Sequence, residues 1–182
     1  MTNRKLSDVK FDALRNAMYH SARRGFLDTL NKSLSFVIVA AGTTAVGDLG
    51  AKIGFGSVQF YAAVAALAGA LQLVFDFGVR ARTHEFLQRR YFEITAQISN
   101  MSTPSEADIN RWDSELQRLY SEEPPPMRAL DAIAYNEACE SLGYSSGKRV
   151  KITWYQSLLR QFYPFHESEF PWIAKESEAK SF

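Results

Sequence analysis

The chain has 182 residues, with 21 Lys and Arg, 20 Asp and Glu, and a formal net charge of +1. This length accommodates one domain with a core, or a membrane insert with a modest soluble part, and it excludes two large domains. The balanced charge excludes a global field that would draw the chain to nucleic acid, so no direct DNA binding is expected. A single cysteine, Cys139, excludes an intramolecular disulfide and is expected to be a buried structural thiol.

Residues 1–32 mix acidic and basic side chains at helical spacing, which predicts an amphipathic N-terminal cytoplasmic helix and not a signal peptide. Its apolar side is expected to consist of Phe11, Leu14, Met18, Gly25 and Phe26.

Two apolar runs, 33–49 and 53–77, predict a transmembrane helical hairpin over 33–77. The stretch from Ile53 to Phe75 carries no charge and is roughly 34 Å long as a helix, which matches a hydrocarbon core of about 30 Å. The first run is shorter and needs its flanks, with Lys32 reaching the headgroups, to cross the same slab. Glycines between the runs indicate a tight turn.

Basic residues flank the hairpin on both sides, and the positive-inside rule therefore places both termini in the cytoplasm. These residues are Arg15, Arg23, Arg24 and Lys32 before it, and Arg80, Arg82, Arg89 and Arg90 after it.

A stripe of small and polar residues, at spacings of three and four on each of the two runs, has two interpretations of equal weight. The stripe either packs helix on helix or lines an aqueous path. Two spans from one chain cannot enclose a channel, so a pore requires a homo-oligomer. The stripe consists of Thr44, Asp48, Ala62, Ala65, Ala66, Gly69, Gln72 and Asp76.

Residues 78–163 predict a cytoplasmic helical region, so the whole chain is expected to be all-α, with a bundle or stalk beside the hairpin. The second span is expected to continue as one helix to Asn100, and Thr103 to cap the next helix in a box with Glu106. The apolar faces of these two helices are expected to be Leu87, Tyr91, Ile94 and Ile98, then Ile109, Trp112, Leu116 and Leu119.

The run "EEPPP" predicts the end of that second helix, because proline lacks the backbone donor and restricts the residue before it. A third helix is expected to end at Gly143, and a fourth to cover "VKITWYQSLLRQFYPF". Residues 164–182 are expected to form a disordered or peripherally docked tail. The "EEPPP" run is also a candidate gating or assembly element, because it sets the angle between two helical layers. The residues expected to act in gating or assembly are Arg89, Arg90, Pro124, Pro125, Asn136 and Glu137.

The chemistry of an enzyme is absent from the sequence. "GYSSGKRV" lacks the glycine spacing and the final hydroxyl of a phosphate-binding loop. His84 and His166 each precede a glutamate, but neither has a second histidine four residues on, so both are interpreted as lone histidines that are structural or exposed. We therefore expect no enzyme activity, no metal and no cofactor.

The layout of the chain resembles the SLATT family of bacterial two-transmembrane proteins. In that family a basic N-terminal helix and a hairpin precede a helical region with an acidic-proline stretch and an Asn-Glu helix. The segment that carries the resemblance is "WDSELQRLYSEEPPPMRALDAIAYNEACESLG". Its matching positions are Glu122, Glu123, Pro124, Pro125, Leu130, Asp131, Asn136, Glu137 and Gly143.

The resemblance implies an anti-phage effector in the bacterial inner membrane. It implies oligomerisation or gating by a cytoplasmic signal, and depolarisation that arrests the infected cell. It also implies a separately encoded sensor or signal-generating partner, with a nucleotide signal as one option. The alternative is a non-conducting membrane anchor that recruits a cytoplasmic enzyme, and a soluble helical adaptor is the third class considered.

Overall fold

The computed structural model describes residues 4–46 and 57–173, and the expected all-α fold is confirmed there. In the described ranges, the pairing of Val150 with Trp172 is an isolated β-bridge outside any strand. The helices are α1 (Leu6–Val46), α3 (Val58–Phe75), α4 (Phe77–Asn100), α5 (Glu106–Glu122), α6 (Arg128–Ser141) and α7 (Trp154–Leu159), with a 3₁₀ turn η1 (Ser146–Lys148).

The chain divides into two compact units, residues 1–22 with 84–182 and residues 23–83. We call the first the bundle unit and the second the apolar unit. Both divisions fall inside helices, because α1 continues without a break through residues 22 and 32, and α4 through residue 83. The N-terminal amphipathic segment and the first apolar run therefore belong to one helix as far as Val46.

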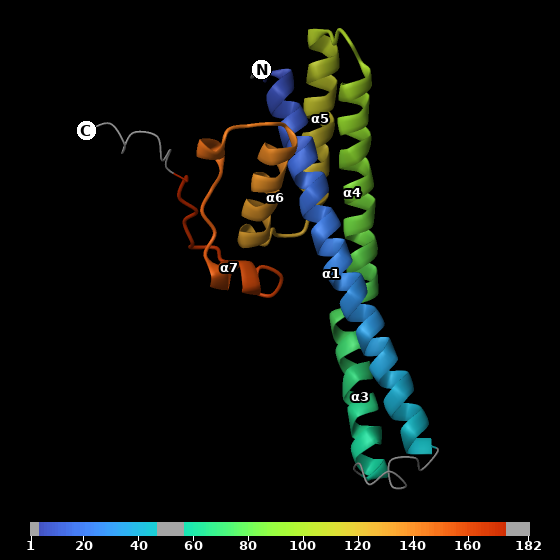
Figure 1. Ribbon diagram of the computed structural model, residues 1–182. Helices are drawn as coiled ribbons and strands as arrows, with labels where there is room; N and C mark the ends of the chain where they lie inside the picture. Colours follow the sequence, from blue (N-terminus) through green and yellow to red (C-terminus); the bar gives the residue numbers. More distant parts are fainter. Residues whose placement is uncertain (1–3, 47–56, 174–182) are drawn as a thin grey trace, which may run out of the picture. The chain divides into compact units, whose positions relative to one another are not determined.

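The core of the bundle unit is built by α1, α4 and α5. In Figure 1, α4 and α5 run side by side, joined by a short connection, and the N-terminal part of α1 lies against them. The predicted faces of α4 and α5 are confirmed in this core, with Ile109 partly buried at its edge. The buried core residues are Val9, Ala13, Ala17, Leu87, Tyr91, Ile94, Ile98, Trp112, Leu116 and Leu119.

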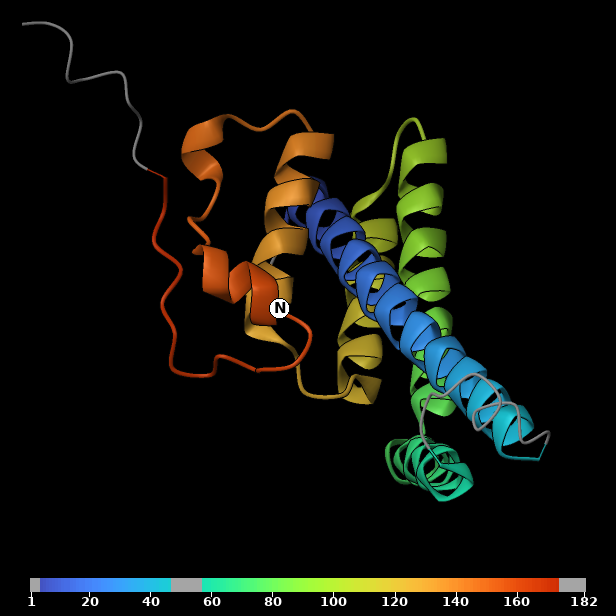
Figure 2. The ribbon, with the colours of Figure 1, turned by 60° about the horizontal axis from the view of Figure 1, so that its bottom comes forward.

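The predicted apolar side of the N-terminal helix was wrong in its centre. Val9, Ala13 and Ala17 are fully buried, whereas Phe11, Leu14 and Met18 are only half-buried. The reason is that α1 contacts helices on two sides: its Arg15 pairs with Asp131 of α6, and its alanines pack in the core with α4 and α5. In Figure 2, α1 runs between α6 and α4. Small alanines at the contact let helix backbones approach closely, a pattern that hydrophobicity alone does not reveal.

The start of α5 lies two residues later than the predicted Thr103 cap. Ser105 is the N-cap, and its hydroxyl accepts the backbone N–H of Asp108 while Asp108 accepts the Ser105 N–H. A hydroxyl residue with an acid three positions on forms the reciprocal capping box, and Ser105 and Asp108 have this spacing just as Thr103 and Glu106 do.

The predicted end of α6 at Gly143 is confirmed. Gly143 has a positive φ of 71°, and the Tyr144 N–H reaches the Cys139 carbonyl at 2.8 Å, the pattern of a Schellman motif. The last predicted helix is much shorter than expected, since α7 covers only Trp154–Leu159. Thr153 and Gln156 form its capping box, so the preceding residues are held outside the helix.

The apolar unit contains the second part of α1, all of α3 and the first turns of α4. The predicted uninterrupted helix through residue 77 is wrong, because α3 ends at Phe75 and α4 begins at Phe77. Asp76 between them has a left-handed φ of 45°, and its N–H bonds to the Gln72 carbonyl. Aspartate tolerates this conformation better than most residues, and its carboxylate accepts the Val79 N–H at 3.4 Å.

Candidate functional site

The most distinctive feature of the apolar unit is how little of its apolar surface is buried. Ala68 is the one buried residue of α3. Large side chains point outward instead: Leu73 is 83% exposed and Phe36 of α1 is 72% exposed. Soluble proteins rarely expose contiguous apolar surface of this kind, which marks a membrane or a protein interaction site.

The segment Val58–Asn100 is the one helical stretch, among the described residues, that is long and apolar enough to cross a membrane. Its apolar part is α3. Part of the first predicted run, 47–49, lies outside the described residues, so the two-span hairpin stays a prediction.

A polar contact joins α1 and α3 within this apolar surface. The Gln72 side-chain amide donates to Asn31 Oδ1 at 2.9 Å and to the Ser35 hydroxyl at 3.0 Å. Gly69 lies one turn before Gln72, and a Cβ there would meet Ile38 of α1 at 4.0 Å, an ordinary contact. The side of α3 that faces α1 therefore combines small residues such as Gly69 with one polar group, the Gln72 amide, which is hydrogen-bonded.

The structure divides the predicted small-residue stripe. Ala65, Gly69 and Gln72 are half-buried toward α1, whereas Ala62 and Ala66 are exposed. Thr44 is half-buried, and its hydroxyl donates to the Ala40 carbonyl of its own helix at 2.8 Å.

Beside the polar contact lies an open cavity of about 360 Å³, lined by Gly69, Gln72, Leu73 and Asp76. Asp76 is exposed. Its predicted counterpart in the first run, Asp48, lies outside the described residues. The cavity brings a carboxylate and an amide together on a helix that is otherwise apolar.

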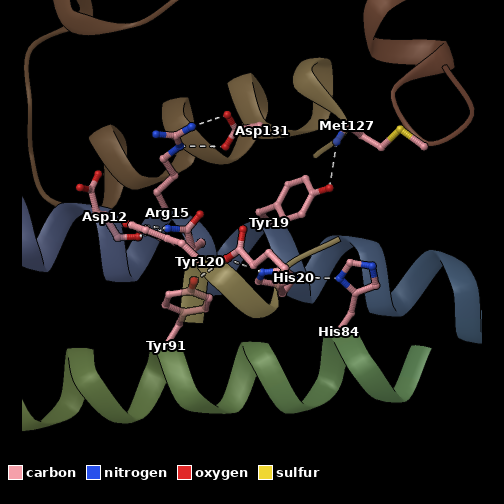
Figure 3. Close-up of polar contacts among 11 residues, drawn as sticks. Asp12, Arg15, Tyr19, His20, His84, Tyr91, Tyr120, Met127 and Asp131 are labelled. Atoms are coloured by element: carbon pink, nitrogen blue, oxygen red, sulfur yellow. Dashed lines mark hydrogen bonds and ion pairs between the residues drawn. The ribbon is translucent and has the colours of Figure 1, made fainter. Parts of the chain in front are cut away.

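The bundle unit contains a buried polar cluster that the sequence interpretation missed. His20 of α1 is fully buried, and its Nδ1 lies 2.7 Å from Nδ1 of His84 on α4 (Figure 3). The other ring nitrogen of His20 lies 3.1 Å from a carboxylate oxygen of Glu123, and the Tyr91 hydroxyl donates to the same oxygen. The His20 ring also stacks on the Tyr91 ring at 5.6 Å.

The proton positions in this cluster are constrained by the short contact between the two histidines. One Nδ1 must donate and the other accept, so only one of the two can carry a proton while the contact lasts. Burial raises the pKa of Tyr91 above its ordinary value, and the Glu123 carboxylate raises it further. The tyrosine therefore remains a neutral donor to Glu123.

Periodicity along the two helices could have revealed this cluster. His20 continues the series Val9, Ala13 and Ala17 at spacings of four and three, which places it on the buried face of α1. His84 precedes Leu87 and Tyr91 at the same spacings on α4. His84 is a buried structural histidine, and its partner His20 comes from a distant part of the chain.

The helices of the bundle unit are further joined by ion pairs. Arg15 donates through Nε to Asp131 Oδ1 of α6 at 2.8 Å and also bonds the second carboxylate oxygen (Figure 3). Burial would lower the pKa of Arg15, but the Asp131 carboxylate outweighs it and raises that pKa. Arg90, one of the predicted assembly residues, pairs with Glu115 of α5 at 2.6 Å, whereas Arg89 is exposed beside Glu85.

The remaining predicted assembly residues lie around α6. Pro124 and Pro125 follow the end of α5 at Glu122, as predicted, and Tyr19 of α1 accepts the backbone N–H of Met127 just after them at 3.0 Å. Asn136 makes two 2.8 Å bonds to Val150, one to its N–H and one to its carbonyl. Glu137 is exposed.

Over the described ranges, no group of three His, Cys, Asp or Glu side chains is placed to hold a metal ion. The predicted burial of Cys139 is confirmed. In its described part the protein is therefore all-helical, with one helix long and apolar enough to cross a membrane. No family model, curated protein or solved structure matches the chain in the comparisons with known proteins.

Proposed function

We propose that this chain is a membrane-embedded effector that assembles into a homo-oligomeric pore and depolarises the bacterial inner membrane. The observation that carries the proposal is the outward-facing apolar surface of α3 and of the second part of α1. In water this surface is costly, at about 25 cal/mol per Å² of exposed apolar area, whereas lipid removes that cost.

Charge supports a defined orientation of the two membrane helices. Arg23, Arg24 and Lys32 precede the first apolar run, and Arg80 and Arg82 follow α3. We infer that both flanks, and hence the bundle unit, lie in the cytoplasm.

The cavity beside Gln72 and Asp76 supports a conducting role. A carboxylate is expensive in contact with lipid, so residues of this kind in membranes face water or protein. Asp76 lies at the end of α3, where a second copy of the chain would enclose it within an aqueous path.

The bundle unit is the part that would receive a signal. The resemblance to the SLATT family assigns it a trigger from a separately encoded anti-phage sensor or from the product of such a protein. Assembly and gating would act through Arg90, Asn136 and the Pro124–Pro125 break.

The Gln72 contact favours a second candidate, a non-conducting anchor that recruits a cytoplasmic enzyme. The Gln72 amide is already hydrogen-bonded to Asn31 and Ser35 within one chain. A group satisfied in this way needs no aqueous lumen, because helix packing alone accounts for it.

The deciding experiment measures membrane potential with a voltage-sensitive dye in cells induced to make the chain, alone and with its neighbouring partner proteins. The variants are Gln72→Leu and Gly69→Leu. The control is Ala63→Leu, which places the same leucine side chain on the exposed side of α3.

Depolarisation that both variants lose and the control keeps supports the pore. An unchanged potential with the protein in the membrane fraction supports the anchor. Extraction as a monodisperse particle without detergent would refute both membrane roles and favour the soluble adaptor.

A further inference from the structure

The bundle unit contains a cavity of about 580 Å³ that no part of the proposed function uses. It lies between the start of α1, α6, the turn after α6 and the C-terminal segment of the described chain. Its volume falls within the range of about 300–1,000 Å³ that is typical of small-molecule sites. We call it the aromatic cavity, after the rings of Phe11, Tyr135, Tyr144 and Trp172 that line it.

The four rings form a continuous aromatic wall although they come from distant segments. The Phe11 ring meets Tyr135 edge-on at 5.0 Å and stacks on Tyr144 at 5.8 Å. Tyr135 in turn meets Trp172 edge-on at 5.9 Å. The bridge between Val150 and Trp172, and the bonds of Asn136 to Val150, hold the C-terminal side of this wall in place.

Carboxylates line the same cavity. Asp8 and Asp12 lie one turn apart on α1. Asp12 pairs with Arg4, but Asp8 is exposed, and its side-chain bond is with the neighbouring Ser7 hydroxyl. Within the described part of the chain no lysine or arginine forms an ion pair with Asp8. One negative charge is thus available to a ligand.

The rings already attract cations from the chain itself. The Lys148 ammonium lies 4.7 Å from the centre of the Tyr144 ring, and the Arg15 guanidinium lies 6.0 Å from that of Tyr135. Both distances fit cation–π attraction. Lys148 is exposed at the cavity, so its ammonium is in a position to be displaced by a ligand of the same charge.

From the aromatic wall, the available Asp8 and the cations seated on the rings, we propose that the aromatic cavity binds an organic cation bearing a methylated ammonium group. The ammonium lies against the ring faces, and Asp8 supplies the countercharge. Recognition of such groups by aromatic cages is a known use of cation–π attraction. Lys148 acts as an internal competitor for the Tyr144 ring.

The test is isothermal titration calorimetry on the full chain in a maltoside detergent, which contains no choline group. Choline is the probe, and 3,3-dimethyl-1-butanol is its neutral isostere. We expect choline to bind about tenfold more tightly than the isostere, since only the charge differs.

Variants then locate the site. Trp172→Leu and Asp8→Asn are each expected to weaken choline binding about fivefold. Trp154→Leu removes a tryptophan that is 78% exposed and outside the cavity, and it is expected to leave binding unchanged. Lys148→Gln is expected to tighten choline binding, because it removes the competitor. Circular dichroism confirms that each variant is folded.

Equal affinity for choline and its isostere, or no heat from choline beyond dilution, would overturn the proposal. The effect of Lys148→Gln on affinity distinguishes an organic cation from a nucleotide, because removing the lysine strengthens binding of a cation and weakens binding of an anion. If adenosine monophosphate binds more tightly than choline and Lys148→Gln abolishes that binding, the cavity takes an anion and the proposal is wrong. None of these outcomes depends on whether the chain conducts ions.

Discussion

The Nδ1 atoms of His20 and His84 lie 2.7 Å apart in the interior of the bundle unit. His20 is fully buried and also contacts Glu123. We expect His20→Phe to keep the stacked ring but to remove the buried contacts of His20 with His84 Nδ1 and with Glu123, which keeps the Tyr91 hydroxyl as a donor. Removing one partner of a buried hydrogen bond costs about 1–3 kcal/mol, so a loss in this range is predicted. Chemical denaturation in detergent, followed by circular dichroism, measures it.

The control for this prediction is His166→Phe, because His166 is exposed. Its free energy of unfolding should change by no more than about 0.5 kcal/mol. Equal effects of the two substitutions would show that the buried pair contributes nothing.

Gln72 is expected to stabilise the pairing of α1 with α3 whether or not the chain conducts. Gln72→Leu removes both of its hydrogen bonds, and such contacts in membranes contribute about 0.6–1.7 kcal/mol. Gly69→Ala should be tolerated, since a Cβ there has ordinary contact distance to Ile38. Cross-linking between one cysteine placed next to Ser35 on α1 and another placed next to Gln72 on α3 would report the pairing. Undiminished cross-linking in Gln72→Leu would contradict the prediction.

Asn136 is expected to hold the chain segment that closes the aromatic cavity. Asn136→Ala removes both bonds to Val150, which is 9% exposed, and should cost about 1–3 kcal/mol. Hydrogen exchange should rise in residues 149–173 more than in α4 or α5. Glu137→Ala, the exposed neighbour, serves as the control. A uniform rise across the bundle unit would mean that Asn136 has no local role.

The raised pKa of Tyr120 is expected to lower the free energy of unfolding at high pH. Burial, with a contribution from the Asp12 carboxylate, raises the pKa of Tyr120 to about 12 from its ordinary value near 10. Between these values the unfolded chain loses a proton that the folded chain keeps, so stability falls as pH rises. The slope from one tyrosine is at most about 1.4 kcal/mol per pH unit, and partial exposure reduces it.

The Tyr120 effect is checked by the melting temperature between pH 10 and 12. Tyr120→Phe should show a shallower decline than the parent chain over this interval. Tyr163→Phe, an exposed tyrosine, should leave the decline unchanged. Parallel curves for all three proteins would contradict the prediction.

The sequence by itself determined most of the helices and the buried faces of α4 and α5. One face of α4 is apolar at helical spacing, and packing α4 on a core must bury it; its residues are Leu87, Tyr91, Ile94 and Ile98. Pro124 ends α5 because its ring restricts the backbone and removes the N–H donor. The apolar character of α3 is likewise a matter of composition. Each of these features depends on residues within a few turns of one another.

Tertiary structure alone decided which polar groups meet. His20 and His84, Gln72 and Asn31, and the rings of Phe11 and Trp172 come from distant parts of the chain. A period of 3.6 residues gives the face of a helix but not its neighbour, so neither the partner of a buried histidine nor the wall of a cavity is encoded locally. The central role of Ala13 and Ala17 has the same origin, since α1 has helices on two sides.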